Sequence, residues 1–172
     1  MRRILLIAPL ALAAFVLAPM ATANAATVSG ACTVSGTAHF TPTGLKSVPG
    51  PMGYDFTGTG TCNGTLNGTP VTNSPVTAHA AGSGTLSCVG AVSTGGSGTL
   101  AFTSAGVTIG FQVDLVGAGS EVTFVLTGNG GGNGVGHATF ATNGTRATEC
   151  SSDAGLNDLG FDIQAAAVGL TG

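Results

Sequence analysis

Residues 76–88, VTAHAAGSGTLSC, decide the fold class because small or apolar residues alternate with polar ones along the stretch. Every second residue from Val76 to Cys88 is apolar or glycine, whereas Thr77 and His79 fall between them. Successive side chains of a β-strand point to opposite faces of a sheet, so a period of two predicts a strand with one buried and one solvated face. Strands of that kind are typical of antiparallel sheets.

The same alternation recurs along the rest of the chain. It is clearest at 31–41, 52–62 and 107–115. Further strands are expected at 69–73, 98–103, 121–127, 135–142 and 161–168. Eight or nine strands separated by Gly, Asn and Ser turns, without a convincing helical period, predict an all-β fold, either an antiparallel β-sandwich or a small closed β-barrel.

The chain has four cysteines: Cys32, Cys62, Cys88 and Cys150. An even count in an exported chain indicates two disulfide bonds that staple the fold. If residues 31–41 pair antiparallel with 52–62 so that Cys32 opposes Cys62, the apolar positions of both strands share one face. We therefore expect the pairs Cys32–Cys62 and Cys88–Cys150. Zinc is disfavoured because no C-x-x-C or H-x-x-x-H spacing is present.

Two further expectations concern the second half of the chain. Residues 107–115 and 121–127 are expected to form a hairpin in which Asp114 opposes Thr123, since a neighbouring register would set Asp114 against Glu121. The run GNGGGNG at 128–134 is expected to form a mobile loop tip, because consecutive glycines are too flexible for a strand.

The N-terminus has the parts of a secretory signal peptide in the expected order. A basic start, MRR, is followed by an uncharged and largely apolar run at 4–20 and by the small-residue cleavage pattern Ala23-Asn24-Ala25. A transmembrane anchor is the alternative, but a run of 17 residues is at the lower limit for crossing a bilayer. We expect residues 1–25 to be removed and residues 26–172 to form a single all-β domain, secreted or associated with the cell envelope.

The charge balance limits the possible partners. Two of the four cationic residues belong to the signal peptide, which leaves Lys46 and Arg146 against seven acidic residues, a formal net charge of −5. Two cations cannot form a patch that follows a phosphate backbone, so neither nucleic acid nor an anionic membrane surface is an expected partner. Membrane insertion is not expected either, for the reasons given below for the pore. Little lysine beside abundant Ala, Gly and Thr suggests a bacterial source.

The sequence offers no catalytic motif. It lacks a G-x-S-x-G elbow, an H-E-x-x-H pair and a phosphate-binding loop. His39, His79 and His137 all fall on polar strand faces, and the register that joins the first two cysteines sets His39 opposite Asp55. A hydrolase centred on one of these histidines needs a nucleophilic serine and a buried carboxylate beside it. No spacing singles out such a serine, so no catalytic residue is assigned.

One acidic group is a candidate metal site: Glu149, Asp153, Asp158 and Asp162. Hard oxygen ligands on a short segment tethered by Cys150 suit Ca²⁺, although the spacing of an EF-hand is absent. No other metal or cofactor is expected.

The inward-facing positions are rich in Gly and Ala, so the phenylalanines must fill most of the interior. Seven belong to the mature chain: Phe40, Phe56, Phe102, Phe111, Phe124, Phe140 and Phe161. All of them, and Tyr54, fall on positions of their strands that are expected to face inward. This leaves no exposed aromatic platform on which a sugar or base could stack. A closed barrel lined by Gly and Ala would instead enclose a small apolar cavity.

These observations favour a secreted or envelope-associated, non-enzymatic β-domain with a binding or surface-structural role. Its expected partner is an unknown protein or a small apolar ligand. Two other classes stay open, namely a secreted hydrolase with a histidine-centred site and a pore-forming barrel of the outer-membrane type. The absence of tryptophan and the single tyrosine argue against the pore, because membrane barrels carry aromatic girdles.

Overall fold

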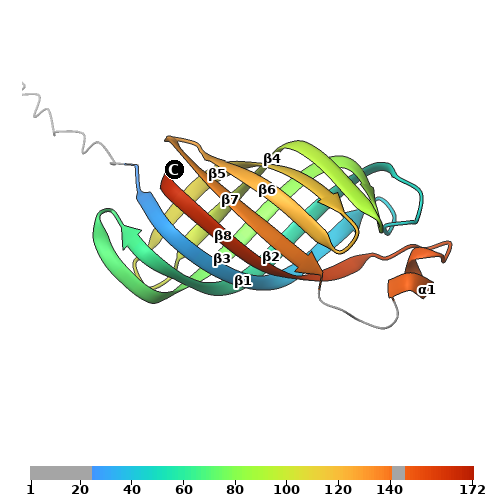
Figure 1. Ribbon diagram of the computed structural model, residues 1–172, viewed down its shortest axis with the longest axis horizontal. Coiled ribbons are helices and arrows are strands. Elements are labelled where there is room, and N and C mark those ends of the chain that lie inside the picture. The colour runs from blue at the N-terminus through green and yellow to red at the C-terminus, as the bar shows by residue number, and fades with distance from the viewer. Residues whose placement is uncertain (1–24, 141–145) are drawn as a thin grey trace, which may run out of the picture.

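The computed structural model describes residues 25–140 and 146–172, apart from the side chain of Thr94. Residues 1–24, nearly all of the predicted signal peptide, lie outside the described residues. The described chain forms eight strands and one short helix (Figure 1). In chain order they are β1 (Thr27–Thr41), β2 (Gly50–Leu66), β3 (Thr69–Ser87), β4 (Gly90–Phe102), β5 (Val107–Ala118), β6 (Glu121–Gly128), β7 (Gly131–Phe140), α1 (Arg146–Cys150) and β8 (Asp158–Thr171).

The strands form one closed antiparallel barrel. Each strand pairs with the next along the chain, and β8 pairs with β1. In Figure 1 the strands run obliquely around the barrel, as closure of a twisted sheet requires. The all-β prediction is confirmed, and of its two architectures the barrel is the one formed.

Residues 69–73 and 76–88, expected as two strands, belong to the single strand β3. The sequence break between them is absorbed by a β-bulge, where the register between β2 and β3 shifts and Asn73 has a φ of 48°. The side-chain oxygen of Asn63 accepts a hydrogen bond of 2.8 Å from the backbone N–H of Asn73 across this bulge. The barrel therefore has eight strands rather than nine.

The period of two sorts the side chains of each strand as predicted. Along β1, Val34, Ala38 and Phe40 are buried inside the barrel, whereas Thr37 and His39 are exposed outside it. The interior is consequently apolar and the outer face is largely polar.

The predicted pairing of the first two strands and both predicted disulfide bonds are confirmed. Cys32 of β1 lies opposite Cys62 of β2 in the sheet and is bonded to it. Cys88, in the turn after β3, is bonded to Cys150, the last residue of α1.

The predicted register of β5 and β6 is wrong by two residues. Asp114 faces Val125 rather than Thr123, because a tight turn of only Gly119 and Ser120 joins the strands. Gly119 has a φ of 65°, which glycine adopts without strain. The turn chemistry thus sets a register that also keeps Asp114 away from Glu121.

Residues 128–134 do not form the expected loop. β6 extends to Gly128 and β7 begins at Gly131, so only Asn129 and Gly130 lie in the turn. The N–H of Gly130 donates to the carbonyl of Thr171 at 2.7 Å, and Gly131 pairs with the same residue in the sheet. The neighbouring strand β8 therefore holds these glycines in the sheet, where Gly132, with a φ of 73°, lies at a shift of register between β7 and β8.

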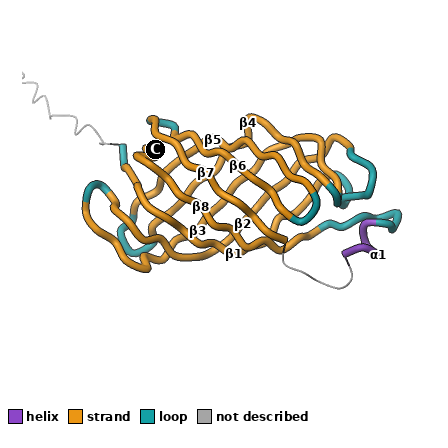
Figure 2. The backbone as a smooth tube through the Cα atoms, in the orientation of Figure 1, coloured by secondary structure: helices purple, strands orange, loops and turns teal. Residues whose placement is uncertain are grey.

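The connections define two ends of the barrel (Figure 2). We call the end with the β2–β3, β4–β5 and β6–β7 turns the turn end, and the end with the β1–β2 loop, the β3–β4 and β5–β6 turns and α1 the loop end. The turn end is packed solid, since Phe102 and Ile109 are 0% exposed and Leu170 is 1% exposed.

Candidate binding cavity

An apolar cavity of about 180 Å³ lies inside the barrel. All eight strands contribute to its lining, and no aspartate, glutamate, lysine or arginine belongs to it. Representative lining residues are Val34, Ala78, Leu100, Phe111, Ala138 and Ala165. Such a wall suits an uncharged, apolar occupant, because an unpaired charge would be costly to bury there.

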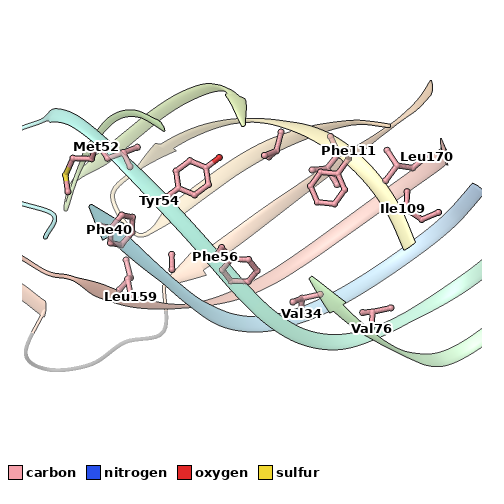
Figure 3. Packing of buried hydrophobic residues seen from close by; sticks show 14 of the residues in the cluster. Val34, Phe40, Met52, Tyr54, Phe56, Val76, Ile109, Phe111, Leu159 and Leu170 are labelled. Atoms are coloured by element: carbon pink, nitrogen blue, oxygen red, sulfur yellow. The ribbon is translucent and has the colours of Figure 1, made fainter. Parts of the chain in front are cut away.

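The interior is hollow because aromatic rings lie along the wall, over glycines of adjacent strands. A Cβ atom on Gly98 of β4 would lie 2.6 Å from the ring of Phe111 of β5, and one on Gly136 of β7 would overlap the ring of Phe124 of β6. Figure 3 shows the rings of Phe56 and Phe111 beside the ribbon of the wall. The rings therefore cover the wall instead of filling the axis. The expectation that the phenylalanines fill most of the interior is wrong for the middle of the barrel.

The turn end forms the floor of the cavity. Val76, Phe102 and Ile109 are at most 2% exposed, yet none of them belongs to the cavity lining. Val28 and Leu170, at the same end of the barrel, border the void. The lining extends in the other direction, to Ser87 and Gly119 at the loop end.

The loop end is held together by contacts between its connections. Leu45 of the β1–β2 loop forms an isolated β-bridge with Leu156, and both side chains are buried. The backbone N–H of Cys88 donates to the carbonyl of Lys46 at 2.9 Å. With the Cys88–Cys150 disulfide, these contacts join the β1–β2 loop, the β3–β4 turn and the connection between β7 and β8 at the loop end.

Arg146, the first residue of α1, joins two turns across this end. Its guanidinium donates to the carbonyl of Cys88 at 2.7 Å and to the carbonyl of Gly119 at 3.3 Å, and it lies 3.9 Å from the centre of the Phe140 ring. Partial burial lowers the pKa of Arg146 from its ordinary value. No sequence pattern around Arg146 predicted that this residue would span the loop end.

Tyr54 brings a polar group into the apolar interior. Its side chain lines the cavity and is 9% exposed. Its hydroxyl is the only buried side-chain nitrogen or oxygen of the described residues that lacks a hydrogen-bond partner. Burial raises the pKa of Tyr54, the neighbouring Ser93 hydroxyl opposes that rise, and the charge of Asp114 adds to it. The inward position of Tyr54 was predicted from the sequence, whereas its unpartnered hydroxyl was not.

The three histidines lie on the outer face, as predicted. His39 is opposite Asp55 in the sheet, but its Nδ1 pairs with Asp158 of β8 at 2.9 Å, while Asp55 pairs with Nε2 of His79 at 3.2 Å. These side chains are about half exposed or more. His137 is within 3.2 Å of the Thr123 hydroxyl. None of the hydrogen bonds made by these histidines reaches a serine among the described residues, so the geometry assembles no hydrolytic triad.

The structure disperses the four acidic residues considered for calcium. Glu149 lies in α1, Asp153 is exposed in the following loop, Asp158 pairs with His39, and Asp162 accepts a hydrogen bond from the Ser35 hydroxyl. Within residues 25–140 and 146–172, no group of three or more His, Cys, Asp or Glu side chains is arranged to hold a metal ion.

Large apolar side chains on the outer surface are all valines in the described part of the chain, and none is aromatic. No helix among these residues is long and apolar enough to span a bilayer.

The fold and the site together define a closed eight-stranded antiparallel barrel with an apolar internal cavity. No protein-family model matches the chain, and comparisons with curated proteins and with solved structures find no significant match.

Proposed function

We propose that this chain is a secreted or envelope-associated, non-catalytic binding protein that holds one small apolar molecule inside its barrel. The observation that carries the proposal is the apolar cavity between a solid turn end and a loop end stapled by Cys88–Cys150. A concave, largely apolar site inside a rigid scaffold is the usual form of a small-molecule binding site.

The free-energy cost of the cavity supports this role. Protein interiors normally pack as densely as organic crystals. At about 24 cal/mol per Å³, a void of about 180 Å³ costs roughly 4 kcal/mol. Because net stabilities are only about 5–15 kcal/mol, an occupant that restores these contacts would stabilise the fold appreciably.

The cavity volume limits the size of the ligand. A cavity of about 150 Å³ lined by Leu, Ile and Phe is known to accommodate benzene, and drug-sized ligands need roughly 300 Å³ or more. A volume of about 180 Å³ therefore suits a compact molecule of about six to ten non-hydrogen atoms.

The cysteine chemistry supports the proposed location. All four cysteines are paired in two disulfide bonds, which persist in oxidising compartments outside the cytoplasm. Together with the predicted signal peptide, this favours export of the mature chain.

The polarity of the wall favours interior binding over a pore. A transmembrane β-barrel presents its apolar band to lipid and usually lines its lumen with polar residues. Here the lumen is apolar, and exposed Thr57, Thr59 and Thr77 lie on the outer face of β2 and β3.

Adjacent alanines of β8 provide a matched test. Ala165 lines the cavity, whereas Ala166 is exposed outside. We expect the wild-type protein to bind α-methylstyrene, a flat hydrocarbon of suitable size, in isothermal titration calorimetry. Ala165→Leu should weaken binding by about tenfold or more because the new side chain occupies the cavity, and Ala166→Leu should leave the Kd within about twofold.

Circular dichroism of both variants checks that the barrel is intact. If Ala165→Leu does not fold, Ala80→Val on another wall of the cavity replaces it. The proposal is wrong if the wild-type protein takes up no hydrocarbon of this size, or if the inward and outward substitutions weaken binding equally.

A further inference from the structure

The unpartnered hydroxyl of Tyr54 indicates what kind of molecule occupies the cavity. Tyr54 stands on β2, inside the barrel, in a wall that is otherwise mostly aliphatic residues, phenylalanine and glycine; Ser87 and His79 are the other polar residues that border the cavity. Its side chain is nine-tenths buried, and no described group satisfies its hydroxyl. A buried polar group without a partner is costly, so its presence in this wall needs an explanation.

Packing alone does not explain the hydroxyl. The ring of Tyr54 lies over Gly82 of β3 and reaches Gly96 of β4, where an added Cβ would collide with the hydroxyl. Figure 3 shows the tyrosine inside the barrel with its oxygen directed away from β2. Phenylalanine, which covers glycines elsewhere in this wall, would cover the Gly82 position without burying a polar atom.

Ser93 is the neighbouring hydroxyl that lowers the pKa of Tyr54, but the two groups are not hydrogen-bonded to each other in this geometry. The Ser93 hydroxyl donates to the carbonyl of Ser83 at 2.7 Å, and its oxygen is not placed to accept from the Tyr54 hydroxyl. A water molecule is also poorly suited, because a buried water needs two to four polar partners and the surrounding wall is apolar.

We propose that the ligand is a neutral, mostly hydrocarbon molecule with one carbonyl or similar oxygen, which accepts a hydrogen bond from the hydroxyl of Tyr54. This inference rests on the proposed binding function and adds the polar group that fixes the ligand's orientation. The oxygen would lie beside Tyr54, and the hydrocarbon part would fill the space between Ala78, Phe111 and Ala165.

The electrostatics of the site agree with this assignment. The pKa of Tyr54 is raised by burial, so the phenol keeps its proton at neutral pH and acts as a hydrogen-bond donor. A carboxylate or ammonium ligand is disfavoured because no aspartate, glutamate, lysine or arginine lines the cavity.

The test compares two ligands that differ only at one position. Acetophenone and α-methylstyrene have the same shape, but the first carries a carbonyl oxygen where the second has a methylene group. We expect Tyr54→Phe to reduce the affinity for acetophenone relative to α-methylstyrene by about three- to tenfold. The affinity for α-methylstyrene serves as the internal reference, so any general effect of the substitution on the cavity cancels in the ratio of the two affinities.

The wild-type protein gives a second, independent measurement. The chain has one tyrosine and no tryptophan, so its near-ultraviolet tyrosine absorption reports on Tyr54 alone. A phenol that donates a hydrogen bond absorbs at longer wavelength. We expect acetophenone to shift the tyrosine band to longer wavelength and α-methylstyrene to cause no such shift, once ligand absorption is subtracted.

The outcomes separate this inference from the proposed function. If both ligands bind, but neither the affinity ratio nor the tyrosine band responds to the carbonyl, the assigned hydrogen bond is wrong and apolar binding stands. If neither ligand binds the wild-type protein, both proposals are overturned. A tyrosine shift in the wild-type protein together with a lower ratio in Tyr54→Phe supports both.

Discussion

The two ends of the barrel use the same alternating sequence pattern for different purposes. At the turn end, Val76, Phe102 and Ile109 are fully buried and do not border the cavity. Beyond this layer, rings such as that of Phe111 lie against glycines of the wall and leave the axis hollow up to the loop end. The residues that contribute most to stability and the proposed binding site are therefore separated along the barrel axis, so each should respond to different substitutions.

The largest effect is expected from truncation of the solid end. Phe102→Ala removes a fully buried ring and should lower the free energy of unfolding by about 3–5 kcal/mol. Phe111→Ala should cost less, below about 3 kcal/mol, because one side of that ring already faces a void and makes fewer contacts. Urea denaturation of both variants measures the difference. Equal losses would mean that the cavity wall is as tightly packed as the turn end.

Removal of the disulfide bonds should have the next largest effect. Replacing either pair by alanine should cost about 2–4 kcal/mol, because the unfolded chain gains freedom. Cys88–Cys150 spans 62 residues and Cys32–Cys62 spans 30, so loss of the former should cost about 0.6 kcal/mol more.

Hydrogen exchange locates the two disulfide effects. Loss of Cys88–Cys150 should speed exchange mainly at the loop end. Loss of Cys32–Cys62 should leave β1 and β2 paired, because these two strands pair along nearly their whole length. Faster exchange at the turn end in the Cys88/Cys150 variant would contradict the separation of the two ends.

Much of the fold was predictable because alternation constrains many residues at once. The cysteine positions fixed the register of β1 and β2, since only one register sets Cys32 opposite Cys62 with both strands' apolar faces aligned. The register of β5 and β6 was predicted wrongly because the two-residue turn at Gly119 and Ser120, and not charge repulsion at Asp114, sets it. That carboxylate instead accepts a hydrogen bond of 2.7 Å from the N–H of Gly95 in a neighbouring bulge.

The site was less predictable than the fold. Alternation along a strand tells which face of the sheet a side chain lies on, but it does not tell which neighbouring residues the side chain contacts there. Tyr54 was placed inside correctly, yet its contact with Gly82 and Gly96 depends on the bulges in β3 and β4. The partner of His39 was missed for a related reason. Asp158 approaches it only because β8 closes the barrel against β1, a pairing that no local pattern reveals.

Alkaline pH provides a smaller test of the hollow region. Burial raises the pKa of Tyr54 in the folded state, so above about pH 10 the unfolded chain loses its phenolic proton first. The contribution of Tyr54 to stability is therefore fully present below that pH and is lost as the pH rises through the folded-state pKa. Denaturation at a series of alkaline pH values should show a decline in the wild-type protein that Tyr54→Phe reduces. A decline of equal slope in both proteins would mean that the hydroxyl is not desolvated.

The smallest effect is expected on the outer face, away from both ends of the interior. The His39–Asp158 and His79–Asp55 pairs are largely exposed, and exposed ion pairs contribute about 0–1 kcal/mol. His39→Gln and His79→Gln should therefore change the free energy of unfolding by less than about 0.5 kcal/mol and leave the Kd for α-methylstyrene unaltered. His137→Gln serves as the matched control, because His137 contacts a threonine hydroxyl instead of a carboxylate. A loss of hydrocarbon binding in either of the first two variants, but not in the control, would show that the outer face is coupled to the cavity. That result would contradict the binding proposal, which depends on a polar outer face that is separate from the apolar interior.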